Sequence, residues 1–293
     1  MLIAAAAKKW QVRPEECIAE QSIITHRPSG RTVSFGAVAG AASKLSIPSR
    51  VGLKDPRNWQ VLGSPVPRFD VPDKVTGKTQ FAIDTKLPGM AYAAIAHCPV
   101  FGGVLKKTNN DAIAQMPGVI KIVPLGNAVA VVAKDSWWYA HQAIRKLPTE
   151  WDLGEHASVS SDTIKDFLRE GIELAHAPVS RDEGDTETAF SEATTLVEAE
   201  YYAPYLDQAT MEPQNCTVIY TPERVDVWAP AQNSEATAAV TAETAEVAID
   251  KVEVHKVHLG GGFGRRGLFI EFVKQAIAIA KTMPGTPVKL IWS

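Results

Sequence analysis

Residues 257–267 read VHLGGGFGRRG, a strand-like stretch that enters a glycine-rich turn and then two arginines ahead of an apolar-periodic segment. Glycine has no Cβ atom, so its backbone approaches a ligand closely and adopts positive φ values. Free N–H groups at a helix start, with guanidinium groups beside them, favour phosphate or another oxyanion. The same pattern also suits a tight strand-to-helix turn without a ligand. The turn alone leaves both interpretations open.

The glycine-rich turn also satisfies the G-x-G-x-x-G pattern of dinucleotide-binding folds, from Gly262 to Gly267. Such a fold needs further strands and helices after the glycines, and an acidic residue about 20 residues on that holds the ribose. Only 26 residues follow Gly267, and none near that spacing is Asp or Glu. A nicotinamide-dependent dehydrogenase is therefore a distant alternative. A P-loop is excluded because no Gly-Lys-Ser or Gly-Lys-Thr follows the glycines.

Composition describes an ordinary globular chain. Its 293 residues are 45% hydrophobic and 22% charged, enough for two domains with cores of their own. The formal net charge of −3 disfavours nucleic-acid binding, and no apolar run approaches the roughly 20 residues of a membrane span. Three widely spaced cysteines give neither a disulfide framework nor metal-ligand spacing, so we expect buried thiols.

Strand-like and helix-like segments alternate along the chain and predict an α+β fold. The predicted division is an N-terminal helix-hairpin-helix segment at 1–56, a second unit at 57–155, an acidic linker at 156–194 and a third unit at 195–293. Predicted strands are Cys17–Thr25, Thr32–Phe35, Met90–Ala96, Ile120–Leu125, Asn127–Ala133, Leu196–Tyr201, Thr217–Tyr220 and Arg224–Trp228. Predicted helices, apart from the opening one, are Ala37–Leu45, Ser136–Leu147, Ser161–Leu174 and Ser234–Glu246.

Two polar segments accompany the glycine-rich turn in the third unit. One is the Met211-Glu212-Pro213 turn between strand-like runs, and the other places Gln232 after a strand that ends in proline. Loop hydrogen bonding and helix capping would explain them without a ligand. Polar side chains at the ends of neighbouring elements are, however, where α/β proteins assemble sites. His255 and His258 fall on opposite faces of a regular strand, so we expect no metal held directly by protein side chains.

Several motifs in fixed order resemble the molybdenum-binding large subunit of the xanthine oxidase and aldehyde oxidase family. The closest branch is that of isoquinoline 1-oxidoreductase beta subunits and bacterial aldehyde dehydrogenases. The motifs are RFDVPDKVTG at 68–77, IDTKLPGM at 83–90, MPGV at 116–119, EWD at 150–152, MEP at 211–213 and GGGFGRR at 260–266. The resemblance implies an α/β hammerhead domain at 57–155, followed by part of the first molybdopterin-binding domain at 195–293.

The resemblance also implies the chemistry. Members of the family insert water-derived oxygen at an electrophilic carbon of a small aldehyde or N-heterocycle, using a molybdopterin cofactor with molybdenum. For this chain the resemblance implies the cytosine dinucleotide form of that cofactor. Electrons leave through [2Fe–2S] clusters on a small (alpha) subunit. The resemblance assigns cofactor contacts to the glycine-rich turn and to the amide that matches the family glutamine near an apical oxo ligand. These positions are Gln232, Gly261, Gly262, Phe263, Gly264, Arg265 and Arg266.

Some family features differ or are absent. Arg265 and Arg266 replace the Gly-Lys of purine-oxidising members, and Gly267 stands where those carry a glutamate, so a purine substrate is not expected. Gln208 stands near a position where the branch often has histidine. The upstream Met-Gly-Gln-Gly segment, the twin-arginine export signal and the downstream catalytic glutamate do not occur in the sequence. We therefore expect a central fragment without a catalytic base, inactive without the remainder of the molybdenum subunit. A folded, cofactor-free inactive fragment is the main alternative, and the compartment stays unassigned.

Overall fold

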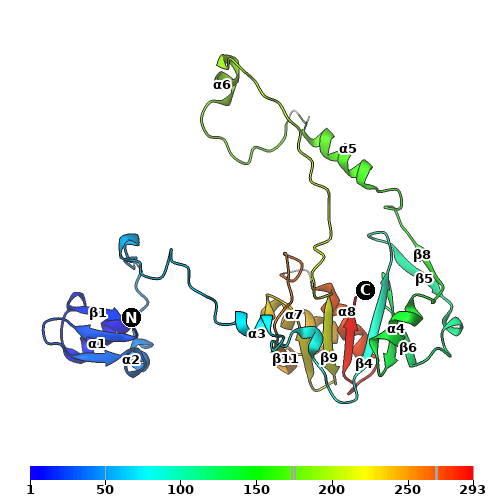
Figure 1. Ribbon diagram of the computed structural model, residues 1–293, viewed down its shortest axis with the longest axis horizontal. Coiled ribbons are helices and arrows are strands. Elements are labelled where there is room, and N and C mark those ends of the chain that lie inside the picture. Colours follow the sequence, from blue (N-terminus) through cyan, green and yellow to red (C-terminus); the bar gives the residue numbers. More distant parts are fainter. Residues whose placement is uncertain (50, 173, 175, 268–269, 293) are drawn as a thin grey trace. The chain divides into compact units, whose positions relative to one another are not determined.

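The computed structural model describes residues 1–49, 51–172, 174, 176–267 and 270–292 (Figure 1). They form two compact units, Met1–Phe69 and Asp70–Ser293. Helices and strands mix within each unit, and this confirms the predicted α+β class. Residue 173, within the predicted helix Ser161–Leu174, lies outside the described residues.

The first unit contains two helices and a three-stranded antiparallel sheet of order β1-β2-β3. Its buried side chains are mostly alanine, with Ile24 and Val38. The prediction of one strand over Cys17–Thr25 is wrong, because the chain reverses at Gln21 and Ser22, where φ is 46° and 64°. Asn-Gly normally signals such a two-residue hairpin, and Gln-Ser does not. The elements are α1 (Leu2–Trp10), β1 (Cys17–Glu20), β2 (Ile23–His26), β3 (Thr32–Ser34) and α2 (Phe35–Ala42).

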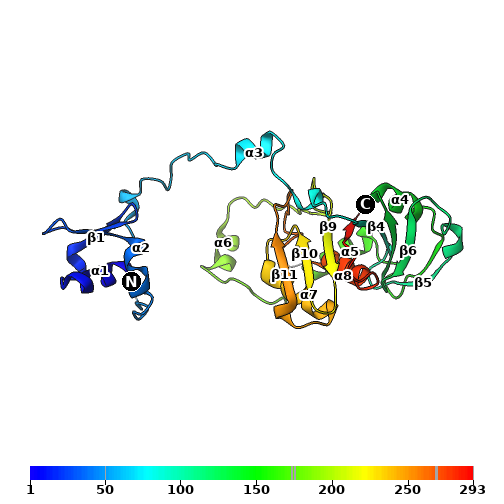
Figure 2. The ribbon, with the colours of Figure 1, turned by 90° about the horizontal axis from the view of Figure 1, so that it is seen from below.

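The second unit is built on a seven-stranded sheet of order β11-β10-β9-β12-β4-β7-β6 (Figures 1 and 2). The strands are β4 (Ala91–His97), β6 (Val119–Pro124), β7 (Ala128–Lys134), β9 (Asn215–Tyr220), β10 (Val225–Ala229), β11 (Val252–Lys256) and β12 (Val288–Ile291). The pairs β4–β12 and β10–β11 are parallel, and the other pairs are antiparallel. Strands from 57–155 and from 195–293 therefore share one sheet, joined where β4 meets β12.

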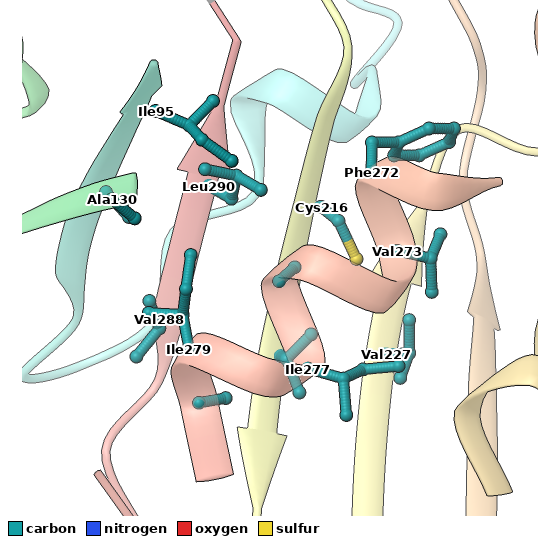
Figure 3. Close-up of a cluster of buried hydrophobic side chains, with 14 of the residues drawn as sticks. Ile95, Ala130, Cys216, Val227, Phe272, Val273, Ile277, Ile279, Val288 and Leu290 are labelled. Carbon is teal, nitrogen blue, oxygen red and sulfur yellow. The ribbon is translucent and has the colours of Figure 1, made fainter. Parts of the chain in front are cut away.

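Helices cover both faces of this sheet. Helix α4 (Trp137–Ile144) packs on β4, β6 and β7, while α7 (Ser234–Ala245) and α8 (Glu271–Lys281) pack on the opposite face. In β7, Val129 and Val131 face α4, whereas Ala130 and Val132 belong to the cluster beneath α7 and α8. Burial on both faces explains the uninterrupted apolar run of β7. Figure 3 shows α8 lying over β9 and β12.

Smaller elements complete the second unit. They are α3 (Val71–Val75), β5 (Val104–Thr108), β8 (Thr149–Asp152), α5 (Ser161–Ile172) and α6 (Thr186–Glu192), with β5 and β8 forming a two-stranded antiparallel sheet. The predicted strand Leu196–Tyr201 is wrong, since no described strand pairs with it. Its alternating residues have the strand pattern but lack the hydrogen-bonded neighbour that a strand requires. Over the described ranges, no helix combines the length and apolar character needed to cross a membrane.

Candidate functional site

The glycine-rich turn, residues 260–267, lies between β11 and α8. Gly261 and Gly264 have φ values of 100° and 88°, which favour glycine. Phe263 has φ of 47° and a side chain that is 75% exposed. A non-glycine residue in the left-handed region, with its aromatic ring in solvent, is uncommon and costs free energy. Such local strain is typical of segments shaped to meet a ligand.

Backbone donors of the turn are free along four successive residues. In the part of the chain that the structure describes, the N–H groups of Gly261, Gly262, Phe263 and Gly264 make no hydrogen bond within the protein. Gly262 is nevertheless buried, and buried N–H groups without partners are rare in folded proteins. A Cβ atom on Gly264 would meet nothing within 4 Å. The turn therefore offers donors and open space, which fits an anionic group.

The Gln232 side chain lies beside this turn. Its Oε1 is 3.5 Å from the place where a Cβ of Gly262 would stand and 3.8 Å from that of Gly267. Its backbone N–H donates to the Arg266 carbonyl at 2.9 Å, which fixes residue 232 against the turn. The cap of α7 is Asn233, whose Oδ1 accepts the Ala236 N–H at 2.9 Å. Gln232 is thus not needed as a helix cap.

Arg266 is fully buried and its guanidinium is bonded within the protein. Nη1 donates to Glu212 Oε2 at 2.5 Å, and Nε donates to Gln214 Oε1 at 3.2 Å. Nη2 donates to the carbonyls of Glu212 and Pro213 at 2.6 and 3.1 Å. These bonds direct the guanidinium into the protein, and the cofactor contact predicted at Arg266 stays a prediction. Sequence spacing could not reveal a partner more than 50 residues away.

Arg265 is also held by protein groups. Its Nη2 lies 2.5 Å from Glu271 Oε1, and its guanidinium stands over the Trp292 ring at 5.3 Å from the ring centre. Both contacts hold the guanidinium beside α8 and β12. The positive charge stays next to the glycine-rich turn, partly neutralised by Glu271.

Glu212 joins the glycine-rich turn to a second turn, residues 81–85. Its Oε2 accepts the Gly260 N–H at 2.6 Å as well as Arg266, and its Oε1 accepts the Ile83 N–H at 2.9 Å. Asn215 Nδ2 donates to Oε1 at 3.1 Å. Sequence reasoning noted this carboxylate only as part of a polar loop. Its partners lie 129 and 48 residues away, so only the folded chain identifies them.

Lys289 holds the second turn, residues 81–85, from the neighbouring strand. Its Nζ donates to the Ile83 carbonyl at 2.6 Å and to the Thr85 carbonyl. The ammonium is almost fully buried, and this burial lowers the pKa of Lys289 to about 8, although Asp84 opposes the change. The turn at 81–85 is further tied to the segment that follows β11, since the Ala82 N–H donates to the His258 carbonyl at 3.1 Å.

A histidine stands near Arg265 as well. The His97 ring lies 4.5 Å from the Trp292 ring, edge to face, and Nε2 is 2.9 Å from Gln275 Nε2. Trp292 Nε1 donates to Gln275 Oε1 at 3.0 Å. Burial lowers the pKa of His97, which favours the neutral ring. This group links the end of β4 to the residues that hold Arg265.

The two histidines singled out near β11 have separate surroundings. His255 stacks on Trp228 at 4.1 Å between ring centres and bonds to Asp226 Oδ1 at 2.7 Å, whereas His258 is exposed. Among the residues with described positions, no three His, Cys, Asp or Glu side chains are grouped to hold a metal ion.

Comparisons with known proteins point to one family. Residues 172–293 match the molybdopterin cofactor-binding domain family. The isoquinoline 1-oxidoreductase subunit beta of Brevundimonas diminuta is 27% identical over all of this chain and 42% of its own length. The membrane-bound aldehyde dehydrogenase [pyrroloquinoline-quinone] of Gluconacetobacter polyoxogenes is 26% identical over 99% of this chain and 39% of its own. The chain thus spans about two fifths of these relatives.

A solved structure agrees at the level of fold. Quinoline 2-oxidoreductase from Pseudomonas putida 86 superposes with a TM-score of 0.60 at 18% identity, over 78% of this chain and 34% of that one. The domain match names molybdopterin, and both relatives are named as oxidoreductases or dehydrogenases. Residues 172–293 thus carry the match to the molybdopterin cofactor-binding domain, and the chain is similar to the molybdenum-binding subunit PaoC of the Escherichia coli aldehyde oxidoreductase, at 25% identity over 79% of this chain.

Proposed function

We propose that this chain forms the cofactor-holding part of a molybdenum hydroxylase that oxidises a small aldehyde or N-heterocycle. The substrate class follows relatives named for isoquinoline, nicotinate and aldehyde oxidation. The carrying observation is the row of four free N–H groups at Gly261–Gly264, with the Gln232 amide beside them. Neutral backbone donors, with open space beside Gly264, suit an anionic cofactor.

The residues of the turn would bind the cofactor and shield it from water. The N–H groups would donate to anionic atoms, Gln232 would offer a donor that does not titrate, and the exposed Phe263 ring would cover the site from water. The chemistry that a molybdenum cofactor supplies is two-electron oxidation of carbon with oxygen from water. Glu212 cannot serve as the base, because its carboxylate accepts four hydrogen bonds from the protein. We assign the catalytic glutamate to the remainder of the molybdenum subunit.

The cofactor form and the electron acceptor are further parts of the proposal. We infer molybdopterin cytosine dinucleotide and a small subunit with [2Fe–2S] clusters from the branch that the motifs resemble. The test is elemental mass spectrometry of the protein isolated with whatever accompanies it. About one molybdenum per chain, with cytidine monophosphate released by acid hydrolysis, is expected. A well-folded chain without molybdenum in its isolated complex would contradict the proposal.

A second candidate is a folded chain that holds no cofactor. It is favoured by one observation, that Glu212 pairs with Arg266 and Glu271 with Arg265, so that protein carboxylates already pair with both arginines. The same molybdenum measurement separates the two candidates. The nicotinamide alternative loses support, because β9 is antiparallel to both of its neighbours and the described strands do not form a doubly wound parallel sheet.

A further inference from the structure

Glu212 occupies a position from which one carboxylate reaches both turns of the site. Oε2 accepts from Gly260 and Arg266, and Oε1 accepts from Ile83 and Asn215. All four donors lie within 3.1 Å, and the side chain is 4% exposed. A buried carboxylate is costly unless its lone pairs are satisfied, and here they are. Neither turn can shift without breaking a bond to this group.

Close packing fixes the same contact. A Cβ atom on Gly260 would stand 2.5 Å from the Glu212 Cβ, so only glycine permits this approach. Arg266 closes the arrangement from the other end of the turn, since its guanidinium binds the Glu212 carboxylate and carbonyl while its own carbonyl accepts the Gln232 N–H. The buried pair therefore holds the start of the turn, its end and the adjacent glutamine.

We propose that Glu212 and Arg266 are positioning residues, a buried clamp that keeps the free N–H groups of the glycine-rich turn and the Gln232 amide in place for the ligand. This rests on the proposed function for the identity of that ligand. The clamp acts through the turn and does not contact the ligand. Under this proposal Arg266 of the GGGFGRR motif supports the turn and does not bind the ligand itself.

Glu212→Gln tests the clamp with little change in size. In the wild type, four donors share the two oxygens of the Glu212 carboxylate. Glutamine has one oxygen and one NH₂ group, and the NH₂ group cannot accept a hydrogen bond, so at least one donor loses its partner. Residue-resolved amide exchange reports the result without any cofactor. The reporters are the N–H groups of Arg265, Gly267 and Gln232, which bond to Gly262, Gly264 and Arg266. Exchange of these amides should become at least tenfold faster, while β9 and β12 amides keep their wild-type rates.

The matched control is Glu271→Gln, which removes the partly exposed partner of Arg265 in the same turn. It should change the reporter amides less than threefold. Unchanged reporters in Glu212→Gln, or an equal acceleration in β9 and β12, would overturn the inference, because the pair would then only stabilise the sheet. If Glu212→Gln does not fold, the same amide-exchange measurement is made on Arg266→Lys. If neither variant folds, the Glu212–Arg266 pair is required for the whole fold, which contradicts a role confined to the turn.

Molybdenum content of the isolated complex gives the second readout. Glu212→Gln should retain at least tenfold less metal than wild type and Glu271→Gln. Equal metal retention with a loosened turn would contradict the positioning role. Absence of metal from wild type would refute the proposed function instead, while the exchange experiment would still decide whether the clamp exists.

Discussion

The two faces of the central strands β9 and β12 are unlike. Beneath α8 the strands present buried apolar groups (Figure 3). On the opposite face they present buried polar groups. The apolar group is Cys216, Val218, Val288 and Leu290, and the polar group is Asn215, Thr217 and Lys289. Apolar contacts stabilise without strict direction, whereas buried polar groups require particular partners. One face therefore supplies stability and the other holds the turns of the candidate site.

The largest loss of stability is expected for a substitution on the apolar face. Phe272→Ala would remove a fully buried ring from the cluster between α8 and the sheet, and should lower the free energy of unfolding by about 3–5 kcal/mol. Phe263→Ala, at the exposed ring, should change it by less than about 0.5 kcal/mol. Urea unfolding followed by circular dichroism measures both. Similar losses in the two variants would show that α8 does not pack as described.

Gly260→Ala tests the close approach on the polar face. The added Cβ would meet the Glu212 side chain, so the free energy of unfolding should fall by about 1–3 kcal/mol. Gly171→Ala is the control, because this helical glycine in α5 has nothing within 4 Å of an added Cβ. That control should be neutral or stabilise by about 1 kcal/mol. A neutral Gly260→Ala would mean that Glu212 can move away from the turn.

Lys289 gives the polar face a pH dependence. Burial lowers its pKa to about 8, against about 10.5 in an unfolded chain. Between these values the unfolded chain binds a proton that the folded chain has released, so this group raises the free energy of unfolding as pH rises. Lys289→Met should remove that rise, whereas Lys274→Met, at an exposed lysine of α8, should keep it. Urea unfolding at pH 8 and pH 10 measures the difference, and equal slopes in all three proteins would contradict the assignment.

The sequence predicted those elements whose cause lies in neighbouring residues. The apolar run of β7 and the capped start of α7 gave elements close to those observed, because burial on two faces and an Asn cap leave marks in neighbouring residues. The hairpin turn at Gln21 and Ser22 left no such mark, since neither residue is a usual choice for positive φ.

Long-range pairing was beyond the sequence. The predicted boundary between 57–155 and 195–293 gave no sign that β4 and β12 would pair in one sheet. The glycine-rich turn and Gln232 were identified as a candidate site from motif order, and their cofactor contacts stay a prediction. The direction of Arg266 depended on Glu212, 54 residues away, so no spacing rule could place its guanidinium.

The smallest effect on stability is expected at Gln232. Its side chain is exposed and caps nothing, so Gln232→Ala should change the free energy of unfolding by less than about 0.5 kcal/mol. The neighbouring Asn233→Ala should cost about 1 kcal/mol, because it removes the cap of α7. Thermal or urea unfolding of both variants establishes this difference first.

Molybdenum retention should rank the same two variants in the opposite order. If the Gln232 amide contacts the cofactor, Gln232→Ala should lower the metal content of the isolated complex several-fold while Asn233→Ala leaves it near wild type. A residue that is dispensable for folding but required for ligand retention belongs to the site itself, unlike the buried groups of β9 and β12. Equal metal content in both variants would remove Gln232 from the site and leave the backbone donors of the turn as its only assigned ligand contacts.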